Sequence, residues 1–191
     1  MSRHNAVAIF FLLFGSCASG QKVIFFKEYI AFRLSTEYFY VDGTYWFSNP
    51  SDRGTKRLIY YPLPMAGKIS SVDSVDVFDI THGIQPRISD RTETGFSFIL
   101  RTAGRETTLY HIAYHQKISG DSAVYILRST QAWNRPLDYA EYKLLVEDSV
   151  VTTGFSYSPD KVYDVEGKKI YLWRRGNFMP DKDFIIYFKS R

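Results

Sequence analysis

Apolar and polar residues alternate with a period close to two through most of the chain from residue 21 onward. In residues 24–34, for example, Phe26, Ile30 and Phe32 fall on one face of an extended strand, and Glu28 is the charged exception on that face. Successive side chains of a β-strand point to opposite faces, so this pattern predicts strands that bury one face. The chain also contains 15 Tyr and 15 Phe, which suit half-buried strands. An all-β fold is therefore expected.

The connections between the predicted strands favour a sandwich. Short glycine turns at Ala103-Gly104 and Glu166-Gly167 separate neighbouring strands, whereas residues 82–94 and 129–138 form longer connections that suit Greek-key crossings. We expect a single-domain antiparallel β-sandwich of Ig-like or Greek-key type over residues 21–191. With 191 − 20 = 171 residues, such a domain can bury about 70% of its unfolded surface.

Two segments receive more specific interpretations. Asp42-Gly43 predicts a type I′ hairpin between strands at 37–41 and 44–47, because both central residues of that turn need positive φ angles. Residues 137–147 fit helical spacing and strand alternation alike, so both alternatives stay open. A strand fits the scheme better, since an isolated helix would have to replace a member of a sheet.

Residues 1–20 have the order of parts of an export signal. Arg3 precedes an uncharged apolar run at 6–14, which is followed by small residues. Two fates remain open: cleavage after Ala18 or Gly20, or processing as a bacterial lipoprotein, because residues 13–17 resemble a lipobox that would make Cys17 the lipidated first residue.

The expected location follows from this signal. The apolar run is shorter than the roughly 20 residues that span a bilayer, and no later segment reaches that length without a charge. We expect an exported protein of the periplasm, outer envelope or extracellular space, with a membrane link only through the possible lipid anchor.

Charge and motif content exclude several classes of function. Lys and Arg number 24 against 20 Asp and Glu, and the basic groups, such as those in 52–57, are too small and interrupted for a nucleic-acid footprint. Cys17 is the only cysteine, so no disulfide is expected. No nucleophile elbow or phosphate-binding loop occurs. We therefore expect no catalytic residue and no cofactor.

Metal binding is not expected either. His111 and His115 would share an ion on a helix, but on a strand they lie about 13 Å apart. Calcium accepts loop carboxylates, yet the acidic groups lack the glycine-defined loop and distal glutamate of an EF-hand. The acidic candidates are Asp181 with Asp183, and Asp73 with Asp76 and Asp79.

The tryptophans divide into two classes. Trp46 and Trp173 lie in alternating strands and are expected to pack in the core. Trp133 and Arg135 lie in a polar, loop-like segment, where an indole can stack on a sugar ring or anchor a protein contact. These two residues are the candidate ligand-binding site; the alternative is that Trp133 packs back under a sheet edge.

Several aromatic strand segments, each near a proline or asparagine, resemble exported bacterial β-sandwich domains of unknown function. The segments are YWFSN at 45–49, LIYYPLP at 58–64, YIL at 125–127 with WNRPL at 133–137, and YLW at 171–173 with NFMPD at 177–181. The resemblance implies the architecture and supplies no catalytic residue.

These observations together predict a non-catalytic exported envelope protein that acts as a protein-binding or structural module. Its expected partner is another envelope protein. The alternative is a carbohydrate-binding module of the cell envelope, with a glycan as ligand, and the third possibility is a cell-wall-directed hydrolase.

Overall fold

The computed structural model describes residues 23–64 and 72–191, so the predicted signal segment and Cys17 lie outside the described residues. Thirteen strands and one 3₁₀ helix are found within these two ranges. Their bounds are β1 Ile24–Leu34, β2 Tyr38–Ser48, β3 Thr55–Pro62, β4 Val72–Asp79, β5 Ile88–Thr92, β6 Gly95–Thr102, β7 Thr107–Lys117, β8 Ser122–Tyr125, η1 Arg128–Trp133, β9 Leu137–Val146, β10 Val150–Phe155, β11 Lys161–Val165, β12 Lys168–Phe178 and β13 Phe184–Ser190.

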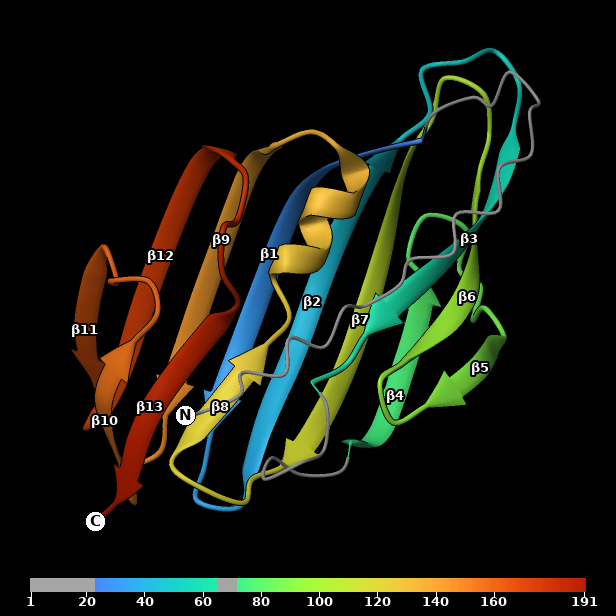
Figure 1. Cartoon of the computed structure of the whole chain (residues 1–191). Coiled ribbons are helices and arrows are strands. Elements are labelled where there is room, and N and C mark those ends of the chain that lie inside the picture. Colours follow the sequence, from blue (N-terminus) through green and yellow to red (C-terminus); the bar gives the residue numbers. More distant parts are fainter. Residues whose placement is uncertain (1–22, 65–71) are drawn as a thin grey trace, which may run out of the picture.

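The strands form two layers (Figure 1). One layer is a seven-stranded sheet in the order β11-β12-β9-β1-β2-β7-β4. The other contains two three-stranded sheets, β10-β13-β8 and β3-β6-β5, and η1 lies over β1 and β2. Buried side chains from all three sheets form one hydrophobic cluster. The predicted all-β sandwich is confirmed.

Aromatic side chains fill the space between the layers. Phe32 of β1 contacts Phe184 of β13 and Tyr125 of β8, with ring centroids 5.1 and 5.4 Å apart. Trp173 of β12 is fully buried, as predicted, and its indole Nε1 donates a hydrogen bond to the Tyr157 carbonyl oxygen at 2.9 Å. Each such ring buries about 150–250 Å², so a core without disulfides can hold the two layers together.

One strand pair departs from the predicted antiparallel arrangement. β1 pairs with β9 in parallel, from Lys27 opposite Tyr139 to Leu34 opposite Val146. Every other pair among the described strands is antiparallel. A parallel pair needs a long crossover, and here the connection consists of β2 to β8 and η1. The pairing of strands that are distant in sequence has no local signal.

The predicted hairpin at Asp42-Gly43 is wrong. Both residues lie inside β2, which runs without interruption from Tyr38 to Ser48 between β1 and β7. Gly43 has no positive φ, so it does not serve the turn conformation that the dipeptide favours. Its small size matters instead, because the ring of Tyr45 lies across it.

Two further assignments are settled by the structure. Residues Leu137–Val146 form the strand β9, which confirms the favoured alternative for this segment. A register shift between Phe25 and Lys27 brings Phe25, rather than the predicted Phe26, into the core. No helix in the described ranges is long and apolar enough to cross a membrane.

Candidate functional site

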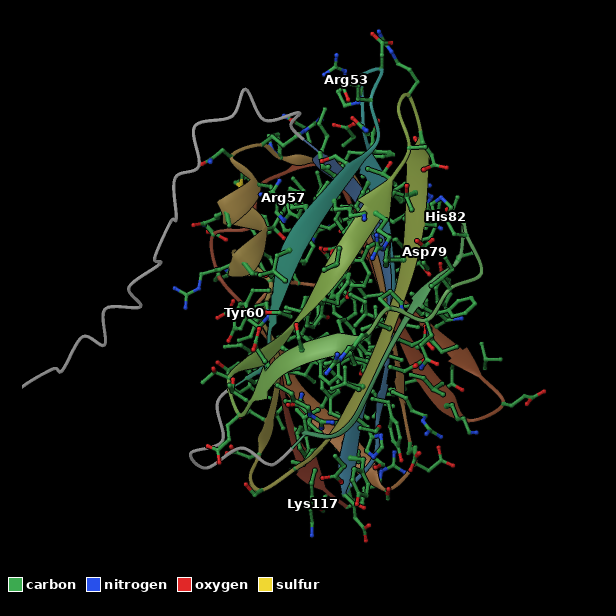
Figure 2. The ribbon with its side chains drawn as sticks, turned by 90° about the vertical axis from the view of Figure 1, so that its right-hand side faces the viewer. Arg53, Arg57, Tyr60, Asp79, His82 and Lys117 are labelled. Carbon is green, nitrogen blue, oxygen red and sulfur yellow. The ribbon has the colours of Figure 1, made fainter. Side chains whose placement is uncertain are left out.

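The outer face of the β3-β6-β5 sheet exposes large apolar side chains. Leu58 on β3 and Ile99 on β6 are cross-strand partners, with 62% and 42% of their surfaces exposed. Tyr60 and Ile84 add exposed fractions of 49% and 50%. Scattered exposed apolar side chains are ordinary, but neighbouring ones on one face mark interaction sites. We call the following set, in which Ile84 comes from the connection after β4, the β3–β6 face: Lys56, Leu58, Tyr60, Ile84, Ile99 and Arg101. Figure 2 labels Tyr60 on this face.

Strand alternation produces this face. Phe96, Phe98 and Leu100 point inward from β6 and are fully buried. The intervening Ile99 and Arg101 must therefore point outward, where no described strand covers them. The same alternation on β3 buries Tyr61 and exposes its neighbour Tyr60.

Two cations lie side by side at one end of the face. Lys56 and Arg101 are directly opposite each other in the β3–β6 register. Both residues are exposed, and neither makes an ion pair with any described residue. Like charges in directly opposed positions destabilise a sheet. This pair therefore forms an uncompensated positive site.

A pocket of about 620 Å³ opens beside the two cations. Ile84, Pro86 and Ile99 form its apolar wall, and Lys56 and Arg101 also line it. Ligand pockets are commonly concave and apolar with a few placed polar groups, in the range of about 300–1,000 Å³. The pocket has both the size and the lining for such a role.

His82 forms a charge cluster with two carboxylates at the pocket (Figure 2). Its Nδ1 lies 2.8 Å from Oδ2 of the buried Asp79, and its Nε2 lies 3.3 Å from Oε1 of Glu106. The hydrogen bond to Asp79 raises the pKa of His82 above its usual value, although partial desolvation opposes this. Because both ring nitrogens face carboxylates, neither is left to activate a nucleophile. The cluster is suited to holding the connection after β4, not to catalysis.

Asn49 fixes the rim of the pocket. Its side chain is fully buried, and its Nδ2 donates to the carbonyl oxygens of Arg53 and Ala103, both at 2.8 Å. Its Oδ1 accepts from the backbone N–H and the hydroxyl of Ser51. These bonds hold the loop before β3 against the end of β6, where Gly54 and Ala103 line the pocket.

A second polar cluster is buried in the core, away from solvent. Glu28 on β1 is 1% exposed, and Tyr142 on β9 donates a 2.5 Å hydrogen bond to its Oε1. Burial raises the pKa of Glu28 from 4.5 to about 7, against the lowering effect of that hydrogen bond. Close by, the hydroxyl of Tyr45 bonds those of Tyr61 and Tyr125 at 2.8 and 3.1 Å, which links the two three-stranded sheets. This cluster is a structural feature with no opening to a ligand.

The predicted ligand-binding pair, Trp133 and Arg135, lies at and just beyond the end of η1. The indole is half-buried against Phe25 and Phe47, with centroids 5.6 and 5.5 Å apart, and the Arg57 guanidinium lies 4.4 Å from its ring centroid. Arg135 forms a 2.6 Å ion pair with Asp138. The two side chains thus have internal partners, and their role in ligand binding stays a prediction.

The histidine and acidic candidates are engaged separately. His111 and His115 lie on the strand β7, as predicted, and bond Asp42 and Ser74. Asp183 accepts hydrogen bonds from the backbone N–H groups of Leu127 and Arg128 and from the Arg128 guanidinium. Within residues 23–64 and 72–191, no group of three or more His, Cys, Asp or Glu side chains is placed to hold a metal ion. The remaining acids bond elsewhere: Asp181 to Tyr157, Asp76 to Gln85, Asp79 to His82, and Asp73 lies 3.9 Å from His115.

Trp46 differs from its predicted place in the core. It lies on the outer face of the seven-stranded sheet, where its ring is half-buried and packs edge-on against Tyr29 at 4.9 Å. Tyr139 continues this aromatic group, and the Lys27 ammonium lies 4.6 Å from the Trp46 ring centroid. Alternation places a residue on one face or the other but does not say which face is covered, so the prediction failed at that step.

Comparison with known proteins supports the fold. No protein-family model matches the sequence, and no curated protein matches it. A candidate nutrient-binding protein of Legionella pneumophila matches 87% of this chain and 67% of its own, with a TM-score of 0.66 and 14% identity. An M1 zinc metallopeptidase of Deinococcus radiodurans matches 88% of this chain at a TM-score of 0.51 and 10% identity. This chain spans 43% of the peptidase chain. At these identities the likeness concerns the fold alone.

The β3–β6 face was missed by sequence reasoning. The alternation of Lys56, Leu58 and Tyr60 was visible as a strand, and so was that of Ile99 and Arg101. The pairing of β3 with β6 was not visible: Lys56 meets Arg101 across 101 − 56 = 45 residues, and Leu58 meets Ile99 across 99 − 58 = 41. Only that pairing joins the apolar side chains and the cations into one surface. The sequence held no signal for this surface, because alternation does not say which face of a strand another layer covers.

Proposed function

We propose that this chain is a non-catalytic protein-binding module of the cell envelope, and that it binds its partner through the β3–β6 face. The observation that carries the proposal is the group of four exposed apolar side chains beside two uncompensated cations. Apolar centres with basic and aromatic residues are typical of protein interfaces. The signal-like sequence of residues 1–20 supports the envelope location.

The fold is compatible with such a role. It occurs in a protein named for nutrient binding and as part of a peptidase, so related architectures accompany different functions. Function must therefore be argued from a site, and the His82 cluster has no free ring nitrogen for the hydrolase alternative.

Substitutions on the face test the proposal. We expect Leu58→Ser and Ile99→Ser each to lower recovery of the partner about tenfold or more, because each removes an apolar side chain worth about 1.5–3 kcal/mol when buried. The measurement is quantitative mass spectrometry after crosslinking in intact cells that carry the tagged full-length chain.

Val162→Ser on β11 is the matched control, since Val162 is 54% exposed but lies on a different sheet. Equal recovery with all three variants would overturn the proposal. All three positions are exposed, so melting temperatures close to that of the unsubstituted protein are expected and should be checked.

Glycan binding is the second candidate, and the aromatic group around Trp46 favours it. Trp46, Tyr29 and Tyr139 lie together on the outer face of the seven-stranded sheet, and aromatic faces of this kind can stack on sugar rings. This surface replaces Trp133 as the better-placed platform, because Trp133 already packs against two core phenylalanines.

The two tryptophans are expected to behave differently when each is replaced by alanine. Trp133→Ala should lower the free energy of unfolding by about 2 kcal/mol, because the loss of a half-buried indole leaves a void beside the core. Trp46→Ala should abolish retention on envelope polysaccharide with little change in stability. Affinity electrophoresis and urea denaturation measure the two effects. Unchanged retention of Trp46→Ala would rule out this glycan platform.

A further inference from the structure

We infer that the pocket beside the β3–β6 face receives a carboxylate from the partner, which is an extended peptide segment with an acidic side chain next to apolar ones. This inference rests on the proposed function and names the partner's chemistry. Three features of the described residues carry it: an uncompensated cation pair, acids that are already engaged, and an apolar wall.

The cation pair comes first. Lys56 and Arg101 occupy directly opposed positions on β3 and β6, where like charges repel. Both line the pocket, and no described acid forms an ion pair with either. An external anion between them would turn this repulsion into attraction. The arginine can also hold a carboxylate through two parallel N–H donors.

The acids near the pocket do not fill this role. Both carboxylate oxygens of Asp79 accept from His82, one from its backbone N–H at 3.0 Å and one from Nδ1 at 2.8 Å. Glu106 directs Oε2 to the backbone N–H of Ala103 at 2.6 Å and to the hydroxyls of Thr102 and Thr108. Asp79 itself lines the pocket, but both of its carboxylate oxygens are engaged by His82, so the negative charges are committed while the positive pair stays available.

The surrounding surface selects a peptide over a small inorganic anion. Ile84 and Ile99 line the pocket, and Leu58 lies opposite Ile99 on the same face. A volume of about 620 Å³ is far larger than one carboxylate group. Apolar side chains that flank an acidic residue would fill the rest and exclude water, which strengthens the charge-assisted hydrogen bonds.

A pair of matched peptides tests the inference with the full-length, isotope-labelled protein. The acidic probe is acetyl-Ile-Glu-Leu-Asp-Val-amide, and the neutral probe replaces its two acids by Gln and Asn. We expect the acidic probe to shift the backbone amide signals of Thr55, Ile84 and Arg101 and to bind about tenfold more tightly than the neutral one. Arg101→Gln and Lys56→Gln should each remove most of this difference between the two probes.

Lys117→Gln is the matched control, because Lys117 is exposed at the far end of β7 (Figure 2). Equal affinities for the two probes, signal shifts confined to other surfaces, or no shifts at all would overturn the inference. Should Leu58→Ser weaken both probes while the Gln variants change neither, only the carboxylate inference fails. If Leu58→Ser and Ile99→Ser recover the crosslinked partner as well as the unsubstituted protein does, the proposed function is overturned instead.

Discussion

Raising the pH from 4.5 to above 7 is expected to lower the free energy of unfolding by about 3 kcal/mol through Glu28 alone. Burial raises the pKa of this carboxyl group to about 7 in the folded protein, whereas the unfolded chain has the ordinary value of 4.5. Each pH unit between these two values contributes roughly 1.4 kcal/mol. The effect on the free energy of unfolding is this large because no basic side chain among the described residues contacts the buried Glu28 carboxyl group.

The direction follows from proton binding. Between pH 4.5 and 7 the folded protein retains a proton on Glu28 that the unfolded chain has lost, so the stabilising contribution is complete below 4.5 and disappears as the pH rises through 7. The pKa of His82 is also raised in the folded protein, so its contribution to the free energy of unfolding is likewise lost as the pH rises. Glu106 and Asp160 have lowered pKa values, and their contributions are lost only as the solution becomes more acidic.

Urea denaturation at a series of pH values measures the effect, and Glu28→Gln isolates it. The variant keeps the shape of the side chain but cannot ionise. Its free energy of unfolding should therefore vary little between pH 5 and 8, apart from the contribution of His82. We expect the variant to be the more stable of the two proteins above pH 7. Parallel curves for the two proteins would show that Glu28 is not held neutral in the fold.

Gly43→Ala is expected to destabilise the protein by about 3 kcal/mol, although alanine normally suits a strand better than glycine. A Cβ at this position would lie 2.5 Å from the hydroxyl oxygen of Tyr45 and 2.6 Å from its Cε2. The ring cannot simply swing away, because it is 4% exposed and its hydroxyl bonds Tyr61 and Tyr125. Overpacking costs about 1–3 kcal/mol, and the loss of buried hydrogen bonds adds to it.

The melting temperature should fall by about 6–12 °C in a chain of this length. Gly154→Ala on β10 is the matched control, since its Cβ would meet Tyr187 at an ordinary 3.5 Å. Differential scanning calorimetry of both variants makes the comparison. A Gly43→Ala protein as stable as the Gly154→Ala protein would mean that the Tyr45 ring has another place to go.

The strands themselves could be predicted from the sequence because alternation is a local property. It located β1, β7 and β13 and identified Glu28 as the exception on an apolar face, and the structure gives that exception a partner in Tyr142. Local reasoning failed at Asp42-Gly43, where the dipeptide favours a turn but the ring two residues later needs the space. The requirement comes from packing between layers, which no short window of sequence contains.

The candidate site was beyond prediction for a related reason. It depends on Lys56 meeting Arg101 and Leu58 meeting Ile99, and such register is set by the whole sheet. Trp46 lies half-buried on the outer face of the seven-stranded sheet and not in the core as expected, because strand assignments do not reveal which surfaces another layer will cover.

The parallel pairing of β1 with β9 also governs how the chain can fold. Lys27 meets Tyr139, so 139 − 27 = 112 residues separate two neighbours at the centre of the largest sheet. Contacts of such long range slow folding, because the entropy of closing the loop must be overcome before the contact forms. Until residues 137–146 have emerged, one edge of β1 stays unpaired and open to association with other chains. β1 thus gains one neighbour, β2, early but waits 112 residues for the other, and during this interval its open edge exposes the protein to aggregation.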